Sequence, residues 1–193
     1  MKNQNQEIYF ETIKCKDYEV FHLEYHKARI SNTISKNIDI HEYIYPPNKE
    51  YIKCKLTYNK DEILGVEYNE YSPKKIDSLK LVFDDTINYN KKRLDRTQID
   101  KLYEQKQNGS DILIVKNNLL TDTSIANIAL LINNIWYTPK TPLLEGTTRA
   151  RLIDLGQIFE KDLQVDDLFT CQKIALMNAM IDFVVIDNLK ILK

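Results

Sequence analysis

Apolar residues in the first part of the chain recur at every second position within short runs, and polar residues separate these runs. Alternation of this kind is typical of β-strands with one buried face, and turn-forming residues between two runs indicate hairpins. The pattern therefore predicts a small α/β unit up to about residue 88. Its expected elements are a hairpin at 8–14 and 19–23, a helix at about 25–38, strands at 51–58 and 62–68, and an extended run at 79–83.

The second part of the chain is predicted to be richer in strands. Two Asn-Asn pairs, Asn117-Asn118 and Asn133-Asn134, stand between apolar runs, as expected for tight hairpin turns. No repeat or low-complexity linker occurs, so we expect two closely packed domains at 1–88 and 89–193. The expected elements of the second are a helix near 98–105, strands at 112–115, 119–121, 128–132 and 135–138, and a helix at 150–159.

The last of these helices follows the tetrapeptide Gly146-Thr147-Thr148-Arg149. Two threonines after a glycine indicate a helix start, with a hydroxyl available to cap the first turn. Unbonded N–H groups and the positive end of the helix dipole form a site suited to a phosphate dianion. Taken alone, the tetrapeptide is more typical of an ordinary capped helix on the surface.

Composition narrows the function classes. Of 193 residues, 43% are hydrophobic and the net charge is -1, which describes a soluble globular protein without the basic excess of a nucleic-acid-binding protein. No apolar run reaches bilayer length and the N-terminus lacks a signal-peptide core, so we expect a cytoplasmic protein without membrane attachment. Cys15, Cys54 and Cys171 are far apart and lack clustered histidines, which argues against disulfides and a metal site and favours buried thiols.

Several short motifs follow one another along nearly the whole chain, and their order is more specific than any one of them. They are Phe10-Glu11-Thr12-Ile13, His26-Lys27-Ala28-Arg29, Lys92-x-x-Asp95-Arg96, Leu120-Thr121-Asp122, Asn127, Trp136-Tyr137-Thr138-Pro139, Gly146-Thr147-Thr148-Arg149 and Asn178-Ala179-Met180. This order resembles the class IV aminotransferases, the fold-type IV pyridoxal-phosphate enzymes. The family includes branched-chain and D-amino-acid transaminases and 4-amino-4-deoxychorismate lyase.

The resemblance implies pyridoxal 5'-phosphate (PLP) as cofactor and assigns the residues that hold its ring. Lys92 matches the lysine that carries the cofactor as a Schiff base, which requires an amine able to lose its proton. Lys91 is the next candidate, and a Lys-Lys-Arg run is otherwise an ordinary solvated loop. Asp122 matches the acid that keeps the ring nitrogen protonated, where the family usually has glutamate. The alternative for Asp122 is a plain turn residue.

Five further positions are implied to surround the phosphate or support the ring. Arg29 matches the family's phosphate-binding arginine, a role for which a bidentate guanidinium is suited. Thr147 and Thr148 supply hydroxyls and amides to the phosphate. Asn127 supports the loop of Asp122, and Asn178 closes the phosphate side. The alternatives are a surface ion pair for Arg29, a satisfied buried amide for Asn127, and core packing around Asn178.

The resemblance favours a lyase. Branched-chain transaminases carry a tyrosine five residues after the Schiff-base lysine, whereas this chain has Thr97. The Asn178 stretch is also similar to the lyase branch, whose members release 4-aminobenzoate and pyruvate in folate biosynthesis. Lys92 would then act as general base and acid. A transaminase and a non-catalytic relative that serves as an interaction module remain alternatives.

The resemblance also implies an α/β (α+β) fold of two domains. The first is a small α/β domain and the second a strand-rich, barrel-like domain, with the cofactor held between them. Family members are typically homodimers, so we expect a homodimer that acts on a small-molecule substrate.

Overall fold

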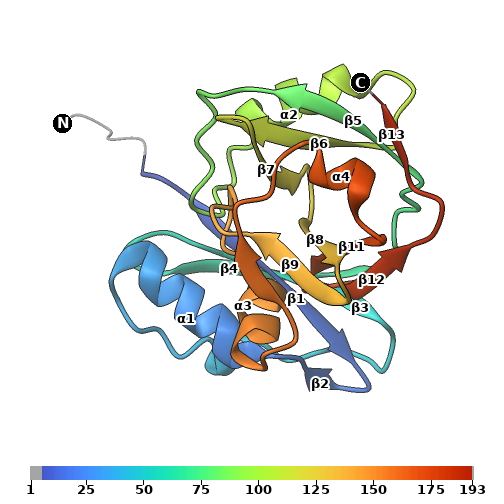
Figure 1. The fold of residues 1–193 in the computed structure, drawn as a ribbon. Helices are drawn as coiled ribbons and strands as arrows, with labels where there is room; N and C mark the ends of the chain where they lie inside the picture. The colour runs from blue at the N-terminus through green and yellow to red at the C-terminus, as the bar shows by residue number, and fades with distance from the viewer. Residues whose placement is uncertain (1–5, 193) are drawn as a thin grey trace. The chain divides into compact units, whose positions relative to one another are not determined.

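The structure is a computed structural model that describes residues 6–192, and its contacts divide the chain into two compact units (Figure 1). Unit 1 runs to Ser72 and includes Lys91–Asp95, and unit 2 comprises Pro73–Asn90 and Arg96–Lys193. The sequence placed the domain boundary at residue 88. Residues 73–90 group with unit 2 because β5 (Ser78–Phe83) pairs in parallel with β6 (Asp111–Lys116).

Unit 1 is an antiparallel sheet with one helix. The sheet has the order β2-β1-β3-β4, and α1 (Leu23–Ile34) places Ile30 in the same apolar core as residues of the sheet. Asp17 and Tyr18 both have positive φ, as a tight hairpin turn between β1 and β2 requires. The remaining elements are β1 (Tyr9–Lys16), β2 (Glu19–Val20), β3 (Ile52–Tyr58), β4 (Ile63–Glu70) and the 3-10 helix η1 (Ile40–Tyr43).

Strand β1 buries every second side chain, and its buried face includes a carboxylate. Tyr9, Ile13 and Cys15 belong to the core of unit 1, and Glu11 stands in the same series with no exposed surface. Period-two alternation makes this series point to one side of the sheet. A buried glutamate must be paired with hydrogen-bond donors or cations to be tolerated.

Unit 2 is built around a large mixed sheet with the strand order β10-β9-β8-β7-β6-β5-β13, from which β11 and β12 extend by pairing of β11 with β8. Its cores are apolar and include both faces of β6. The other elements are β7 (Leu119–Thr123), β8 (Asn127–Ile132), β9 (Ile135–Pro139), β10 (Phe159–Lys161), β11 (Lys173–Asn178), β12 (Asp182–Ile186), β13 (Lys190–Leu192), α2 (Thr97–Tyr103), η2 (Glu104–Lys106), α3 (Thr147–Asp154) and α4 (Asp167–Thr170).

The mixed, strand-rich architecture expected from the sequence is confirmed, but the bounds of two helices were wrong. The first helix ends at Ile34 rather than near residue 38, because Ser35 adopts a left-handed conformation that closes it. The helix expected at 150–159 is α3, which begins earlier at Thr147 and ends at Asp154. Gly156 has a φ of +65°, and Phe159 then begins β10, so the apolar residues at the end of the expected helix belong to a turn and a strand.

Candidate functional site

In unit 1, the backbone of Lys92 pairs with strand β1. The N–H of Phe10 donates to the carbonyl of Lys92 over 3.0 Å, and the N–H of Leu94 donates to the carbonyl of Ile8 over 2.8 Å. The Nζ atom of Lys92 lies 4.5 Å from the centroid of the Phe10 ring. These contacts attach Lys92 to a strand and place its ammonium group against an aromatic face.

Lys91, the alternative anchor, is occupied differently. Its Nζ donates to the carbonyl of Thr33 in α1 over 2.8 Å and lies 5.7 Å from the centroid of the Tyr9 ring. The two neighbouring lysines therefore extend to different places. The ammonium group of Lys91 is engaged by a helix carbonyl, whereas that of Lys92 lies against the Phe10 ring.

A buried cluster of charged and polar groups lies on the same strand. The Glu11 carboxylate accepts from Nε of Arg29 over 2.9 Å, from Nη2 of Arg29, and from Nδ1 of His26 over 2.5 Å. Burial by itself raises the pKa of Glu11, but the Arg29 charge and the His26 hydrogen bond outweigh burial and hold the pKa at about 2. Glu11 is therefore an anion that binds Arg29 through two donors.

His26 is fully enclosed between this carboxylate and the neighbouring cations. Burial lowers the pKa of His26 most strongly, the hydrogen bond with Glu11 raises it, and the charges of Arg29 and Lys92 lower it further. The balance favours a neutral ring whose Nδ1–H donates to Glu11. Unit 1 thus gathers two of the sequence-predicted site residues, Arg29 and Lys92, around β1.

In unit 2, the carboxylate of Asp122 is held by two neutral donors. Asn127 donates from Nδ2 to Oδ1 over 2.7 Å, and the backbone N–H of Leu144 donates to Oδ2 over 2.8 Å. Asp122 is only 5% exposed, and burial raises its pKa to about 6 although these bonds and the charge of Arg149 lower it. Within residues 6–192, no ion pair involves Asp122. A cationic group beside this carboxylate would offset its cost of burial.

Asn127 connects Asp122 to the loop before α3. Its Nδ2 also donates to the carbonyl of Leu144 over 2.9 Å. A Cβ atom on Gly146 would lie 1.9 Å from Oδ1 of Asn127, so only a glycine allows the backbone to approach this closely. The sequence-predicted support of the Asp122 loop by Asn127 corresponds to an observed hydrogen bond.

The first turn of α3 lacks the threonine cap that the sequence predicted, and this difference bears on anion binding. The N-cap is Gly146, and Thr147 is already the first helical residue, so neither threonine hydroxyl acts as the expected cap. Among the described residues, no side chain caps this end, where Thr147 and Thr148 are buried. The N–H groups of the first turn are therefore not satisfied by a capping side chain, as in anion-binding helix ends.

Two other residues of unit 2, Arg149 and Asn178, make hydrogen bonds that stabilise the fold. Arg149 is 5% exposed, and its Nη2 donates to the carbonyl of Pro139 over 2.9 Å and to Glu160 over 2.5 Å. Asn178 accepts from the N–H groups of Met180 and Ile181 through Oδ1, and its Nδ2 donates to the carbonyl of Ile125 over 3.2 Å. Asn178 thus closes the turn between β11 and β12.

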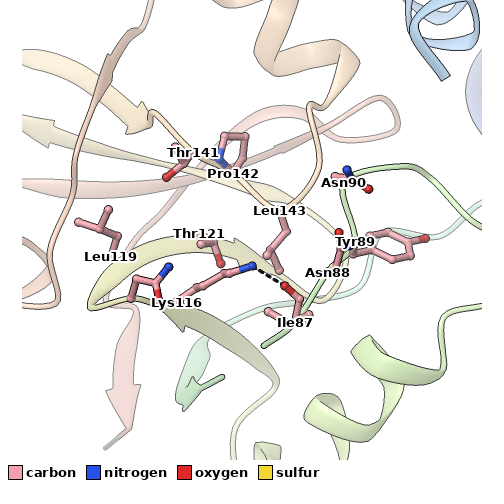
Figure 2. Close-up of a pocket in the computed structure, with 11 residues that line it drawn as sticks. Ile87, Asn88, Tyr89, Asn90, Lys116, Leu119, Thr121, Thr141, Pro142 and Leu143 are labelled. Atoms are coloured by element: carbon pink, nitrogen blue, oxygen red, sulfur yellow. Dashed lines mark hydrogen bonds between the residues drawn. The ribbon is translucent and has the colours of Figure 1, made fainter. Parts of the chain in front are cut away.

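Unit 2 also contains a pocket of about 360 Å³. Figure 2 shows Lys116 within it, donating from Nζ to the carbonyl of Ile87 over 2.6 Å. Leu119 and Thr121 line the pocket, so by strand alternation the side chain of Asp122 points to the other face of β7. The pocket is therefore separate from the Asp122 carboxylate.

Reasoning from the sequence missed Glu11 and His26 as site residues, although both stand in the motifs that carry the resemblance. The available signal was a glutamate at a position where alternation calls for an apolar side chain. Among the described residues, no group of three or more His, Cys, Asp or Glu side chains could hold a metal ion, and no helix is long and apolar enough to cross a membrane.

Comparison with known proteins gives the family. The family model of amino-transferase class IV matches residues 84–189. The chain belongs to the class IV aminotransferase family. The class IV chain is 36% identical, over 135 residues, to an uncharacterized protein of Haemophilus influenzae, a match covering 70% of this chain and 71% of the relative. Membership indicates an enzyme.

Solved structures are also similar to this chain, including one from Haemophilus somnus and one from Mycobacterium tuberculosis. A proposed 4-amino-4-deoxychorismate lyase from Haemophilus somnus is 31% identical, with a TM-score of 0.82, and the match covers 91% of this chain and 97% of that chain. A hypothetical aminotransferase from Mycobacterium tuberculosis, in a PLP-bound form, is 16% identical with a TM-score of 0.77, covering 97% and 83%. The second likeness shows the fold alone.

Proposed function

We propose that this protein is a PLP-dependent lyase that converts 4-amino-4-deoxychorismate into 4-aminobenzoate and pyruvate. The observation that carries the proposal is the likeness to the Haemophilus somnus protein, which extends over nearly the whole length of both chains. Thr97, the first residue of α2, stands where branched-chain transaminases carry tyrosine, and this difference also supports a lyase.

The residues present fit PLP by their chemistry. Asp122 is a buried carboxylate with a raised pKa, suited to a cationic ring nitrogen. The first turn of α3, which lacks a side-chain cap among the described residues, suits a phosphate. We propose that Thr147, Thr148 and Arg29 hold the phosphate, that Asn127 orients Asp122, and that Asn178 shapes the turn beside the site.

The chemistry follows from these assignments. When bound, PLP supplies an electron-withdrawing ring that stabilises negative charge on the substrate. Asp122 holds a proton at the ring nitrogen. Lys92 anchors the cofactor through Nζ, takes the proton from the substrate Cα and later returns a proton. Lys91 cannot replace it without giving up its hydrogen bond to Thr33.

The cofactor assignment is tested by absorption spectroscopy with two matched variants. The protein with added PLP should show an absorption band above 400 nm (about 420 nm) that borohydride removes, and peptide mapping should find the label on Lys92. Lys92→Ala should abolish the band, whereas Lys91→Ala should retain it. A label on any other lysine, or no uptake of PLP, would contradict the proposal; a protein that takes up no PLP is the non-catalytic alternative.

The reaction is tested by its products. Supplied with 4-amino-4-deoxychorismate, the protein should release 4-aminobenzoate and pyruvate in equal amounts. Alanine or glutamate with 2-oxo acids should give no exchange of the amino group. Rapid amino exchange without release of 4-aminobenzoate would identify a transaminase instead.

The same resemblance leads us to propose a homodimer. Light scattering of the purified protein should then give about twice the chain mass of 22.8 kDa. A mass that stays at one chain at all concentrations would contradict this part of the proposal.

A further inference from the structure

The buried ion pair on β1 gives the orientation of Arg29 a defined cause. Glu11 has no exposed surface, and its two carboxylate oxygens accept from Nε and Nη2 of Arg29. A carboxylate that binds two adjacent N–H groups of a guanidinium fixes the plane of that guanidinium. The third donor, His26 Nδ1, fixes the carboxylate in turn.

We propose that Glu11 is a positioning residue, which holds the Arg29 guanidinium in the orientation that binds the cofactor phosphate. The inference rests on the proposed function, because it takes the cofactor to be PLP. Glu11 accepts from the Nε edge of the guanidinium, through Nε and Nη2. The ion pair therefore determines in which direction the remaining donors of Arg29 are presented.

The free energy of burial favours a role for Glu11 beyond stability. Burying a carboxylate, a guanidinium and an imidazole costs desolvation free energy, and apolar side chains in the same volume commonly give equal or greater stability. Glu11 lies among core residues, where Tyr9 and Ile13 fill the neighbouring positions of the same face. A charged residue in this series is explained if it prepares Arg29 for an anion, since preorganised donors lose little freedom on binding.

The test compares the affinities of the apoprotein for PLP and for pyridoxal, which lacks the phosphate. The dissociation constant for pyridoxal divided by that for PLP measures recognition of the phosphate. This ratio is insensitive to a general loss of stability. Glu11→Gln should reduce this ratio about tenfold or more and leave pyridoxal binding nearly unchanged. Glu67→Gln is the matched control, because Glu67 is an exposed sheet residue that pairs only loosely with Lys55, and it should leave the ratio unaltered.

A second comparison separates positioning from folding. In an Arg29→Met background, Glu11→Gln should change the ratio by less than about twofold, because the residue to be positioned is gone. If Glu11→Gln does not fold, Glu11→Asp keeps the charge but shortens the side chain, and should lower the ratio partially. A lower melting temperature with an unchanged ratio would overturn the inference. Failure of the unaltered protein to take up PLP would instead overturn the proposed function and this inference with it.

Discussion

Asn127 donates from Nδ2 to Oδ1 of Asp122 over 2.7 Å, and the two residues face each other across the pairing of β7 and β8. Both are 5% exposed. The bond therefore joins an amide and a carboxylate whose positions are set by strand register rather than by a flexible loop. Because no cation neutralises Asp122 in an ion pair within the described chain, its protonation should respond to pH in the neutral range.

The first prediction concerns Asp122 and the pH dependence of stability without cofactor. The pKa of Asp122 is about 6 in the folded protein against an ordinary value of 3.8, so the folded state binds the proton more tightly. Its contribution to stability is then present below about pH 4 and is lost as pH rises through 6. Asp122→Asn should remove this slope.

Between pH 4 and pH 7, the difference in unfolding free energy between Asp122→Asn and the unaltered protein should move by about 2 kcal/mol in favour of the variant. Urea unfolding at several pH values measures this difference, in which other titrating groups cancel. A difference that is constant with pH would show that Asp122 titrates normally. The variant should also bind PLP without the protonated ring that the proposed chemistry requires.

The second prediction concerns Asn127, which donates the hydrogen bond to Asp122. Asn127→Ala removes a hydrogen bond that lowers the pKa of Asp122, so this pKa should rise above about 6. Loss of a buried bond to a charged group should also reduce the free energy of unfolding by about 1–3 kcal/mol. Carbon NMR of the Asp122 carboxyl follows the pKa directly. Asn69→Ala, at an exposed position of β4, is the control and should change neither quantity.

Much of the fold could be predicted because local rules and tertiary packing agree there. Asn117, Asn118, Asn133 and Asn134 all have positive φ, and each Asn-Asn pair forms the tight turn that the sequence indicated. The buried runs on either side of these turns form paired strands. In these hairpins the turn and the hydrophobic pattern specify the same register.

The C-terminal region could not be predicted in this way. Strand β11 lies between β8 and β12 and is followed by a turn closed by Asn178, without an Asn-Gly type signal. Its position depends on long-range pairing with β8, which no local pattern encodes. The roles of Glu11 and His26 also depend on a contact between a strand and a helix, and the sequence shows only that a carboxylate interrupts an apolar series.

The third prediction concerns the thiols. Cys15 and Cys54 have no exposed surface, whereas Cys171 is half-buried and burial raises the pKa of its thiol. A thiol reagent such as DTNB should therefore modify one cysteine in the native protein, with a rate that increases as pH rises above about 8. Cys171→Ser should abolish the native reaction. Modification of two or more thiols before unfolding would show that the core of unit 1 opens readily.

The fourth prediction uses two glycines with opposite surroundings. A Cβ atom at Gly146 would lie 1.9 Å from Oδ1 of Asn127, whereas nothing lies within 4 Å of one at Gly65. Gly146→Ala must displace Asn127, so it should cost about 1–3 kcal/mol of unfolding free energy and raise the pKa of Asp122 as Asn127→Ala does. Gly65→Ala, on β4, should change stability by no more than about 0.5 kcal/mol.

A double variant tests whether Gly146 and Asn127 act together. Because Gly146→Ala already displaces the side chain of Asn127, adding Asn127→Ala to Gly146→Ala should cost less than Asn127→Ala alone. Urea unfolding of the three single variants and the double variant measures this, and fully additive costs would show that Gly146 and Asn127 act independently.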